Sequence, residues 1–371
     1  MFKISNFQIY CMLIILVAPL AYLDTPKRIS TCLFNNAWLA AFGAIIPGLL
    51  MAAMFLYIIN KSTSPFPLLL EEHLGLVIGK ILGFIYVFFF LLITIYSLRL
   101  FTDFILSNVL PGTPISVFIG VLLLVGFYAI KTGLENIARV SELFILIGLP
   151  FSFLITLLAL GEHHNIESLL PFADMSYGSF GLGLAYASFA LGKLMPILTL
   201  AFFSNNRKGL GLTVYQVVFT YALLIGLTTL ATTLTLEGLP TSYSTFPTFS
   251  MVRALRFGQW VQNIDIIFIG IWILGVFATV TIAWFMACFT AQQVLKLRDY
   301  RFLAAPSTLI IGISSLVLSR NILEVQIMGD IIIPIIYSIF LILIPMVIFI
   351  ITLFKPYPED HNISKPVSTT V

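Results

Sequence analysis

The chain has 371 residues, of which 60% are hydrophobic and only 9% carry a charge, with a formal net charge of +3. So few charged side chains cannot cover a water-exposed surface, which excludes a soluble globular protein and favours a chain whose solvent is mostly lipid. The three cysteines lie far apart in the sequence and give no disulfide or zinc spacing. No cluster of carboxylates, histidines or cysteines lies within an apolar run, so we expect no enzyme, cofactor or metal site.

Ten apolar segments are long enough to cross a bilayer, which takes about 20 residues of helix. They are expected at about 7–33, 36–59, 80–109, 114–130, 137–160, 179–203, 209–234, 262–295, 303–319 and 331–354. A short amphipathic piece (67–78), two connections (161–178 and 236–261) and a polar C-terminal tail (355–371) complete the chain. The pattern predicts a single all-α membrane domain.

Lysines and arginines in the connections predict the orientation of the chain. If the N-terminus is cytoplasmic, twelve of them fall on the cytoplasmic side, six on the outer side, and Lys193 alone lies within the membrane. Arg28 and Arg99 are counted in the outer set. Because basic residues accumulate in cytoplasmic connections, this distribution predicts that both termini lie inside and that the number of spans is even.

The spans divide into two halves of five, at about 7–160 and 179–354, and the first span of each half is irregular. Pro19 interrupts the first, and several glycines precede Lys193 in the sixth. Interrupted spans at corresponding positions of two halves point to the binding site of an inverted-repeat transporter fold. The alternative is that these prolines and glycines are ordinary kinks, because both residue types are common in membrane helices.

Lys193 lies in the middle of the sixth span, between Gly192 and Pro196, which both weaken a helix. A lysine at the centre of a bilayer costs at least about 2.5–3.5 kcal/mol, so it needs a cavity or a partner. Three interpretations remain open: the lysine contacts an anionic group of a ligand, it takes the place of a coupling cation, or carbonyls exposed at the break satisfy it. The sequence identifies no carboxylate at its depth.

Several patches together resemble the B subunits of the Ger-type spore germinant receptors (GerAB-type), members of the amino acid–polyamine–organocation transporter superfamily. Each patch is weak alone, but their order and spacing extend over nearly the whole chain. The patches are residues 4–8, 79–83, 133–142, 169–172, 246–247, 252–253 and 262–265, with Trp272. One departure is that Ala18 and Pro19 stand where the family usually has glycines.

The resemblance implies a LeuT-like 5+5 inverted repeat of ten helices, in which helices 1 and 6 are discontinuous. It also implies that the protein senses a small nutrient, such as an amino acid, together with an A subunit and a lipoprotein C subunit. The location would be the bacterial cell membrane or the spore inner membrane, with both termini in the cytoplasm or spore core. The alternatives are an autonomous amino acid permease, possibly proton-coupled, and a subunit that only anchors the complex.

In folds of this kind, spans one, three, six and eight line the ligand site. Breaks in the first and sixth spans would offer backbone N–H groups to a carboxylate and freed carbonyls to an ammonium group. The candidate ligand-binding residues are Ala18, Pro19, Leu20 and Ala21 in the first span, Thr94 and Tyr96 in the third, Ser188, Phe189, Gly192 and Lys193 in the sixth, and Thr279 and Thr281 in the eighth.

Overall fold

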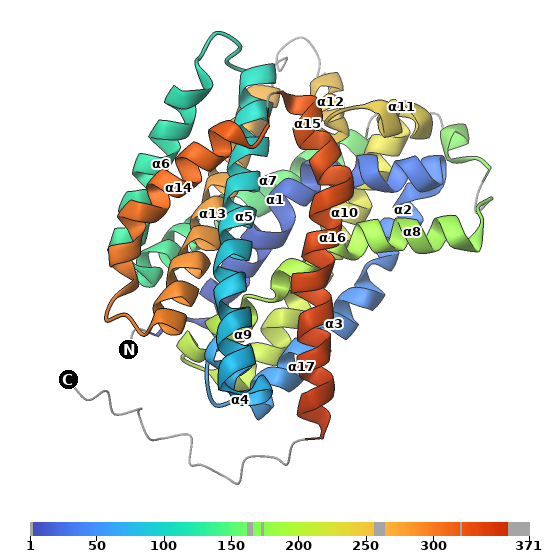
Figure 1. Cartoon of the computed structure of the whole chain (residues 1–371). Coiled ribbons are helices and arrows are strands. Elements are labelled where there is room, and N and C mark those ends of the chain that lie inside the picture. Colours follow the sequence, from blue (N-terminus) through green and yellow to red (C-terminus); the bar gives the residue numbers. More distant parts are fainter. Residues whose placement is uncertain (1–2, 162–165, 172–173, 256–263, 320, 355–371) are drawn as a thin grey trace.

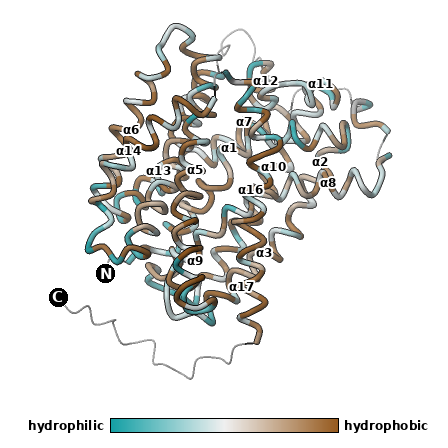
Figure 2. The backbone as a smooth tube through the Cα atoms, in the orientation of Figure 1, coloured by the Kyte–Doolittle hydropathy of each residue, from teal (hydrophilic) through white to brown (hydrophobic). Residues whose placement is uncertain are grey.

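The structure is a computed structural model that describes residues 3–161, 166–171, 174–255, 264–319 and 321–354. The polar tail predicted at 355–371 lies outside these residues. Secondary structure in the described part is helical, apart from one parallel bridge between Ile4 and Ser204. Apolar residues run along the helices, and hydrophilic residues gather toward the two ends of the bundle (Figure 2).

The long helices form a bundle crossed by shorter elements (Figure 1). The long helices are α1 (Asn6–Leu33), α3 (Ile45–Lys61), α5 (Leu76–Asn108), α6 (Ile115–Thr132), α7 (Leu134–Gly161), α10 (Leu210–Leu236), α13 (Ile264–Leu295) and α14 (Ala304–Val317). The short helices outside the interrupted spans are α2 (Ala37–Gly43), α4 (Leu68–Leu74), α11 (Gly238–Tyr243) and α12 (Pro247–Ala254).

The described residues contain nine apolar segments long enough to cross a membrane, and the first of them, Asn6–Lys61, has 56 residues. A straight helix of that length would extend for about 84 Å, more than twice the roughly 30 Å of a hydrocarbon core. The chain instead turns at the short 3₁₀ segment Phe34–Asn36, where Phe34 has a φ of 44°. This turn divides the segment into two passes, which confirms the predicted ten.

The predicted interruption of the first span is wrong, because α1 runs unbroken through both of its prolines. A proline lacks the N–H that would bond the carbonyl four residues earlier, so Pro19 frees the carbonyl of Ile15. The hydroxyl of Thr279, in α13, donates to this carbonyl at 2.6 Å. The helix therefore passes Pro19 without leaving the freed carbonyl unbonded.

The second proline of α1 is handled in the same way. Pro26 frees the carbonyl of Tyr22, and the hydroxyl of Thr248 in α12 donates to it at 2.5 Å. Both hydroxyls come from segments more than 200 residues away along the chain. Continuity of α1 is thus a tertiary property of the fold.

The predicted interruption of the sixth span is confirmed. The span consists of α8 (Tyr177–Ser188), a 3₁₀ segment (Phe189–Leu194), α9 (Ile197–Leu200) and a second 3₁₀ segment (Ala201–Phe203). In Figure 1, α8 extends to the side of the bundle, whereas α9 lies within it. The hydroxyl of Tyr221 donates to the carbonyl of Ala187, just before the break, at 2.8 Å. The break therefore has support from α10.

The last span is also irregular. It contains α15 (Ile322–Ile327), a π-helical segment η7 (Met328–Ile332), α16 (Ile333–Tyr337), a second π-helical segment η8 (Ser338–Leu343) and α17 (Ile344–Leu353). Such π-helical segments are rare and occur frequently at functional sites. The hydroxyl of Tyr86, in α5, donates to the carbonyl of Phe340 within η8 at 2.7 Å.

The charge count placed Arg99 in an outer connection, but the structure does not. It is buried within α5, where its Nε donates to Asp103 at 2.9 Å. Its Nη1 donates to the carbonyl of Ser315, near the C-terminal end of α14, at 3.1 Å. The guanidinium thus satisfies a helix end inside the bundle, a structural role that neutralises its charge.

Candidate ligand site

Asp24 and Arg28 are one helical turn apart in the last third of α1, and their side chains form an ion pair. Arg28 Nη1 also lies 3.1 Å from Asp330 Oδ1 and donates to the carbonyl of Gly329 at 2.7 Å. Both of these partners belong to η7. A single guanidinium therefore joins the first membrane span to the last. Arg28, like Arg99, was counted in an outer connection, but it lies inside the helical bundle.

Lys193 lies close to this ion pair. The lysine is 8% exposed, in the 3₁₀ segment of the sixth span, and interacts electrostatically with Asp24 and Arg28. Its Nζ lies 5.6 Å from the centroid of the Tyr337 ring, within cation–π range. Asp24 is therefore a carboxylate that attracts Lys193 and that the sequence did not identify, although its ion pair is with Arg28.

Two further aromatic rings pack against Tyr337, the ring over which the ammonium group lies. The Tyr337 ring is stacked on Phe189, with centroids 5.6 Å apart and planes 11° apart, and Phe89 meets it edge-on at 5.7 Å. Tyr96, in α5, is 7% exposed and interacts electrostatically with Asp24, Arg28 and Asp330. We call Asp24, Arg28, Lys193 and Asp330, with Tyr96 and Tyr337, the ion cluster.

The ion cluster is open at one end. The side chains of Asp24 and Asp330 are 27% and 47% exposed, whereas Lys193 is buried. Exposure rises toward the end of the bundle where α1 ends and the last span begins. A small charged molecule could reach the two carboxylates from that end and meet Lys193 at greater depth.

Beneath the cluster, the centre of the bundle is closed. A cavity of about 10 Å³ lies between five spans, with room for no more than about one water molecule. It is lined by Leu16, Phe90, Ile93, Lys193, Pro196, Thr279, Ala283, Met286 and Leu341. A ligand the size of an amino acid requires these helices to separate.

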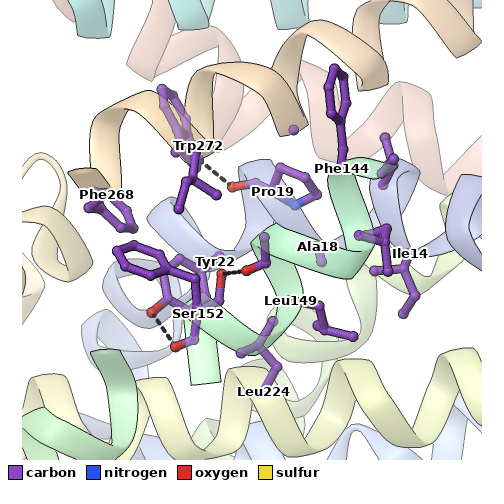
Figure 3. A pocket seen from close by; sticks show the side chains of 16 residues that line it. Ile14, Ala18, Pro19, Tyr22, Phe144, Leu149, Ser152, Leu224, Phe268 and Trp272 are labelled. Carbon is purple, nitrogen blue, oxygen red and sulfur yellow. Dashed lines mark hydrogen bonds between the residues drawn. The ribbon is translucent and has the colours of Figure 1, made fainter. Parts of the chain in front are cut away.

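A second, mostly apolar pocket of about 60 Å³ lies beside Pro19, between α1, α7 and α13 (Figure 3). Trp272 Nε1 donates to the carbonyl of Pro19 at 2.8 Å, and the Tyr22 hydroxyl donates to the carbonyl of Ser152 at 3.3 Å. Because these polar groups are already bonded to each other, the pocket offers a ligand shape and apolar surface more than hydrogen bonds.

The structure divides the predicted site residues among several places. Tyr96, Phe189 and Lys193 meet at the ion cluster, and Lys193 and Thr279 line the small central cavity. Ala18 and Pro19 line the pocket of Figure 3, whereas Leu20 and Ala21 are buried in α1. Gly192 packs against Leu341.

Three hydroxyls of the predicted set bond within their own helices. Thr94 donates to the carbonyl of Phe90, Ser188 to that of Leu184, and Thr281 to that of Phe277. Thr281 also lines a separate groove of about 550 Å³ between α6, α7 and α13. The structure therefore does not bring these three residues to the ion cluster.

Sequence reasoning missed four members of the cluster: Asp24, Arg28, Asp330 and Tyr337. A signal for the first two was present, because opposite charges four residues apart within an apolar span are spaced to pair on one helix face. No comparable local pattern marks Asp330 or Tyr337, since they join the site through tertiary contacts.

Comparison with known proteins identifies the family. The model of the family described as spore germination protein matches residues 3–323. The chain belongs to this family. It is 24% identical over 377 residues to spore germination protein KB of Bacillus subtilis, which covers 97% of each chain. It is 26% identical over 302 residues to spore germination protein YndE of the same organism, covering 77% of this chain and 80% of YndE.

Among solved structures, the fold is similar to that of Mhp1, a nucleobase-cation-symport-1 family transporter, in a closed conformation with bromovinylhydantoin bound. The TM-score is 0.55 at 13% identity, over 89% of this chain and 75% of the transporter. This similarity confirms an all-α transporter fold. With its apolar spans and its family, the chain is a multi-pass integral membrane protein.

Proposed function

We propose that this chain is the B subunit of a spore germinant receptor, which binds a small nutrient such as an amino acid and signals through A and C partner subunits. The ion cluster carries the proposal, because it places two cations and two carboxylates between the first, sixth and last spans. The cell membrane or spore inner membrane, with both termini on the cytoplasmic or core side, is the proposed location.

The charges of the cluster complement a zwitterion. A ligand carboxylate would lie between Lys193 and Arg28, where charge-assisted hydrogen bonds are strong. A ligand ammonium group would face Asp24 and Asp330, and the Tyr337 and Phe189 rings would bound its side chain. This arrangement favours the interpretation that Lys193 contacts the ligand over the interpretation that it takes the place of a coupling cation.

Ligand binding to the purified chain tests the proposal. The full-length protein in lipid nanodiscs is heated with each of the twenty proteinogenic amino acids, and a ligand that binds the folded state raises Tm. We expect at least one amino acid to stabilise the protein. Its decarboxylated amine and its deaminated acid, each lacking one charge, should stabilise it less. Equal stabilisation by all three compounds would contradict recognition of a zwitterion.

The transporter fold gives specific support to one alternative, an autonomous amino acid permease, possibly proton-coupled. Uptake of radiolabelled amino acid into vesicles that contain this chain alone separates the two functions. A receptor subunit should bind without saturable uptake, whereas saturable uptake, accelerated by an inward proton gradient, would establish the permease.

We also propose that the membrane domain comprises two five-span repeats, at about 7–160 and 179–354. Co-expression of this chain with A and C subunits of the family, followed by co-purification, tests whether it assembles with them. A complex that assembles, but in which no nutrient binds to this chain, would indicate a subunit that only anchors the others.

A further inference from the structure

The hydroxyl of Tyr337 is a buried polar group that makes no hydrogen bond to the described residues. Tyr337 ends α16 and is 2% exposed, and its hydroxyl has no hydrogen-bond partner within the described part of the chain. A buried hydroxyl that leaves its hydrogen bond unmade costs free energy, and lipid offers no water to replace the partner. Such a group in a native fold calls for a reason.

The surroundings of Tyr337 place this residue at the ion cluster. Lys193 lies over one part of the ring, Phe189 is stacked on it, and the tyrosine interacts electrostatically with Tyr96. Tyr96 in turn interacts with the charges of Asp24, Arg28 and Asp330. Tyr337 therefore borders the charges that a ligand in the ion cluster would meet.

Tyr337 also occupies a special place in its helix. The five residues of α16 separate η7 from η8, so a π-helical segment adjoins each end of the turn that carries Tyr337. Such π-helical segments occur frequently at functional sites, and the Tyr86 hydroxyl bonds one carbonyl of η8. A new bond at Tyr337 would thus form between the two π-helical segments of the last span.

We propose that Tyr337 is a specificity-determining residue whose hydroxyl donates a hydrogen bond to the carboxylate of the bound nutrient, beside Lys193. This bond joins the last membrane span to the occupied site. The inference rests on the proposed function, because it requires a carboxylate ligand in the ion cluster. Together with Asp330, it gives the last span two contacts with a ligand site that the sequence analysis expected from spans one, three, six and eight.

The test compares Tyr337→Phe with Tyr86→Phe as a matched control. Both variants lose one buried hydroxyl at the interface of α5 and the last span, but the Tyr86 hydroxyl bonds only the protein. The probes are the amino acid that stabilises the wild type most, from the panel of twenty, and its carboxamide. Kd is measured on the full chain in nanodiscs. Tyr337→Phe should raise Kd for the amino acid about tenfold, because it removes one hydrogen bond to the ligand.

The carboxamide adds a readout that a merely structural role would not change. Wild-type protein should prefer the amino acid to its amide, and Tyr337→Phe should reduce that preference, whereas Tyr86→Phe should retain it and lower Tm. Unchanged Kd values in Tyr337→Phe, or an equal loss in both variants, would overturn the role of Tyr337 while leaving the proposed function intact. Failure of the wild type to bind any amino acid would overturn both.

Discussion

Lys193 brings a full charge into the interior of a membrane protein, and its surroundings only partly compensate that charge. Asp24 attracts the ammonium group, Arg28 repels it, and the Tyr337 ring adds a cation–π contact. An ion cluster that needs several partners to balance it contributes little to stability and is more often retained for function. The lysine therefore belongs to recognition more than to folding.

Replacement of Lys193 by methionine should separate these two contributions. Lys193→Met removes the charge and keeps a flexible apolar stem, so we expect Tm without ligand to stay the same or rise. Kd for the amino acid should increase about 30-fold or more, because the ligand loses a hydrogen bond to a charged group. Lys131→Met, at an exposed site at the end of α6, is the control and should change neither quantity. A Lys193→Met protein that binds and responds normally would refute a ligand-contacting role.

Gly329 gives the cluster its close packing. An added Cβ there would lie 2.2 Å from the Tyr96 hydroxyl oxygen and 3.1 Å from Arg28 Nη2. Gly329→Ala should therefore displace both groups and destabilise the protein by about 1–3 kcal/mol, as overpacking does in other cores. Thermal unfolding measures the loss.

Two further variants make the origin of this effect visible. Tyr96→Phe removes the atom that meets the new methyl group, so it should recover part of the loss in the Gly329→Ala background. Gly270→Ala, in α13, adds a methyl group where no atom lies within 4 Å and should not destabilise. If both alanine variants behaved alike, the crowding at Gly329 would not be the cause.

Helix α1 shows how far sequence can predict this fold. The spans, the turn between the first two and the break in the sixth were predictable, because apolar run length, glycine and proline act locally. The continuity of α1 at Pro19 was not, since it depends on Thr279, which is 264 residues away along the chain. For the same reason, the prediction of Lys193 as a site residue could not name Asp24 and Arg28 as the charges that act on it.

A double-mutant cycle tests the origin of α1 continuity. Thr279→Val leaves the Ile15 carbonyl without its donor, and we expect a loss of about 1–3 kcal/mol in the free energy of unfolding. In a Pro19→Ala background, the restored backbone N–H can bond that carbonyl, so the same threonine change should cost much less. Thr281→Val, whose hydroxyl bonds within its own helix, is the control. Equal losses with and without Pro19 would show that the threonine acts otherwise.

At the scale of the whole molecule, the centre of the bundle is closed. The ion cluster joins the first span to the last, and the central cavity beneath it has a volume of about 10 Å³. Packed helices change between discrete arrangements rather than deforming continuously. Binding of an amino acid at this depth therefore requires the sixth and last spans to separate, and the free energy of that opening reduces the observed affinity.

A disulfide between these two spans should hold the closed state. An ideal Cβ on Gly192 lies 3.1 Å from the Cβ of Leu341, close to the 3.5–4.5 Å typical of disulfides, so Gly192→Cys with Leu341→Cys should cross-link after a small shift. Cys11, Cys32 and Cys288 are replaced by alanine beforehand, so that only the new pair reacts. Oxidised protein should lose amino acid binding, and reduction should restore it, because the link prevents the separation that the ligand needs.

Each single-cysteine variant should bind equally well in both redox conditions. Full binding by the cross-linked protein would mean that the ligand occupies the open end of the ion cluster without any movement of the sixth span away from the last.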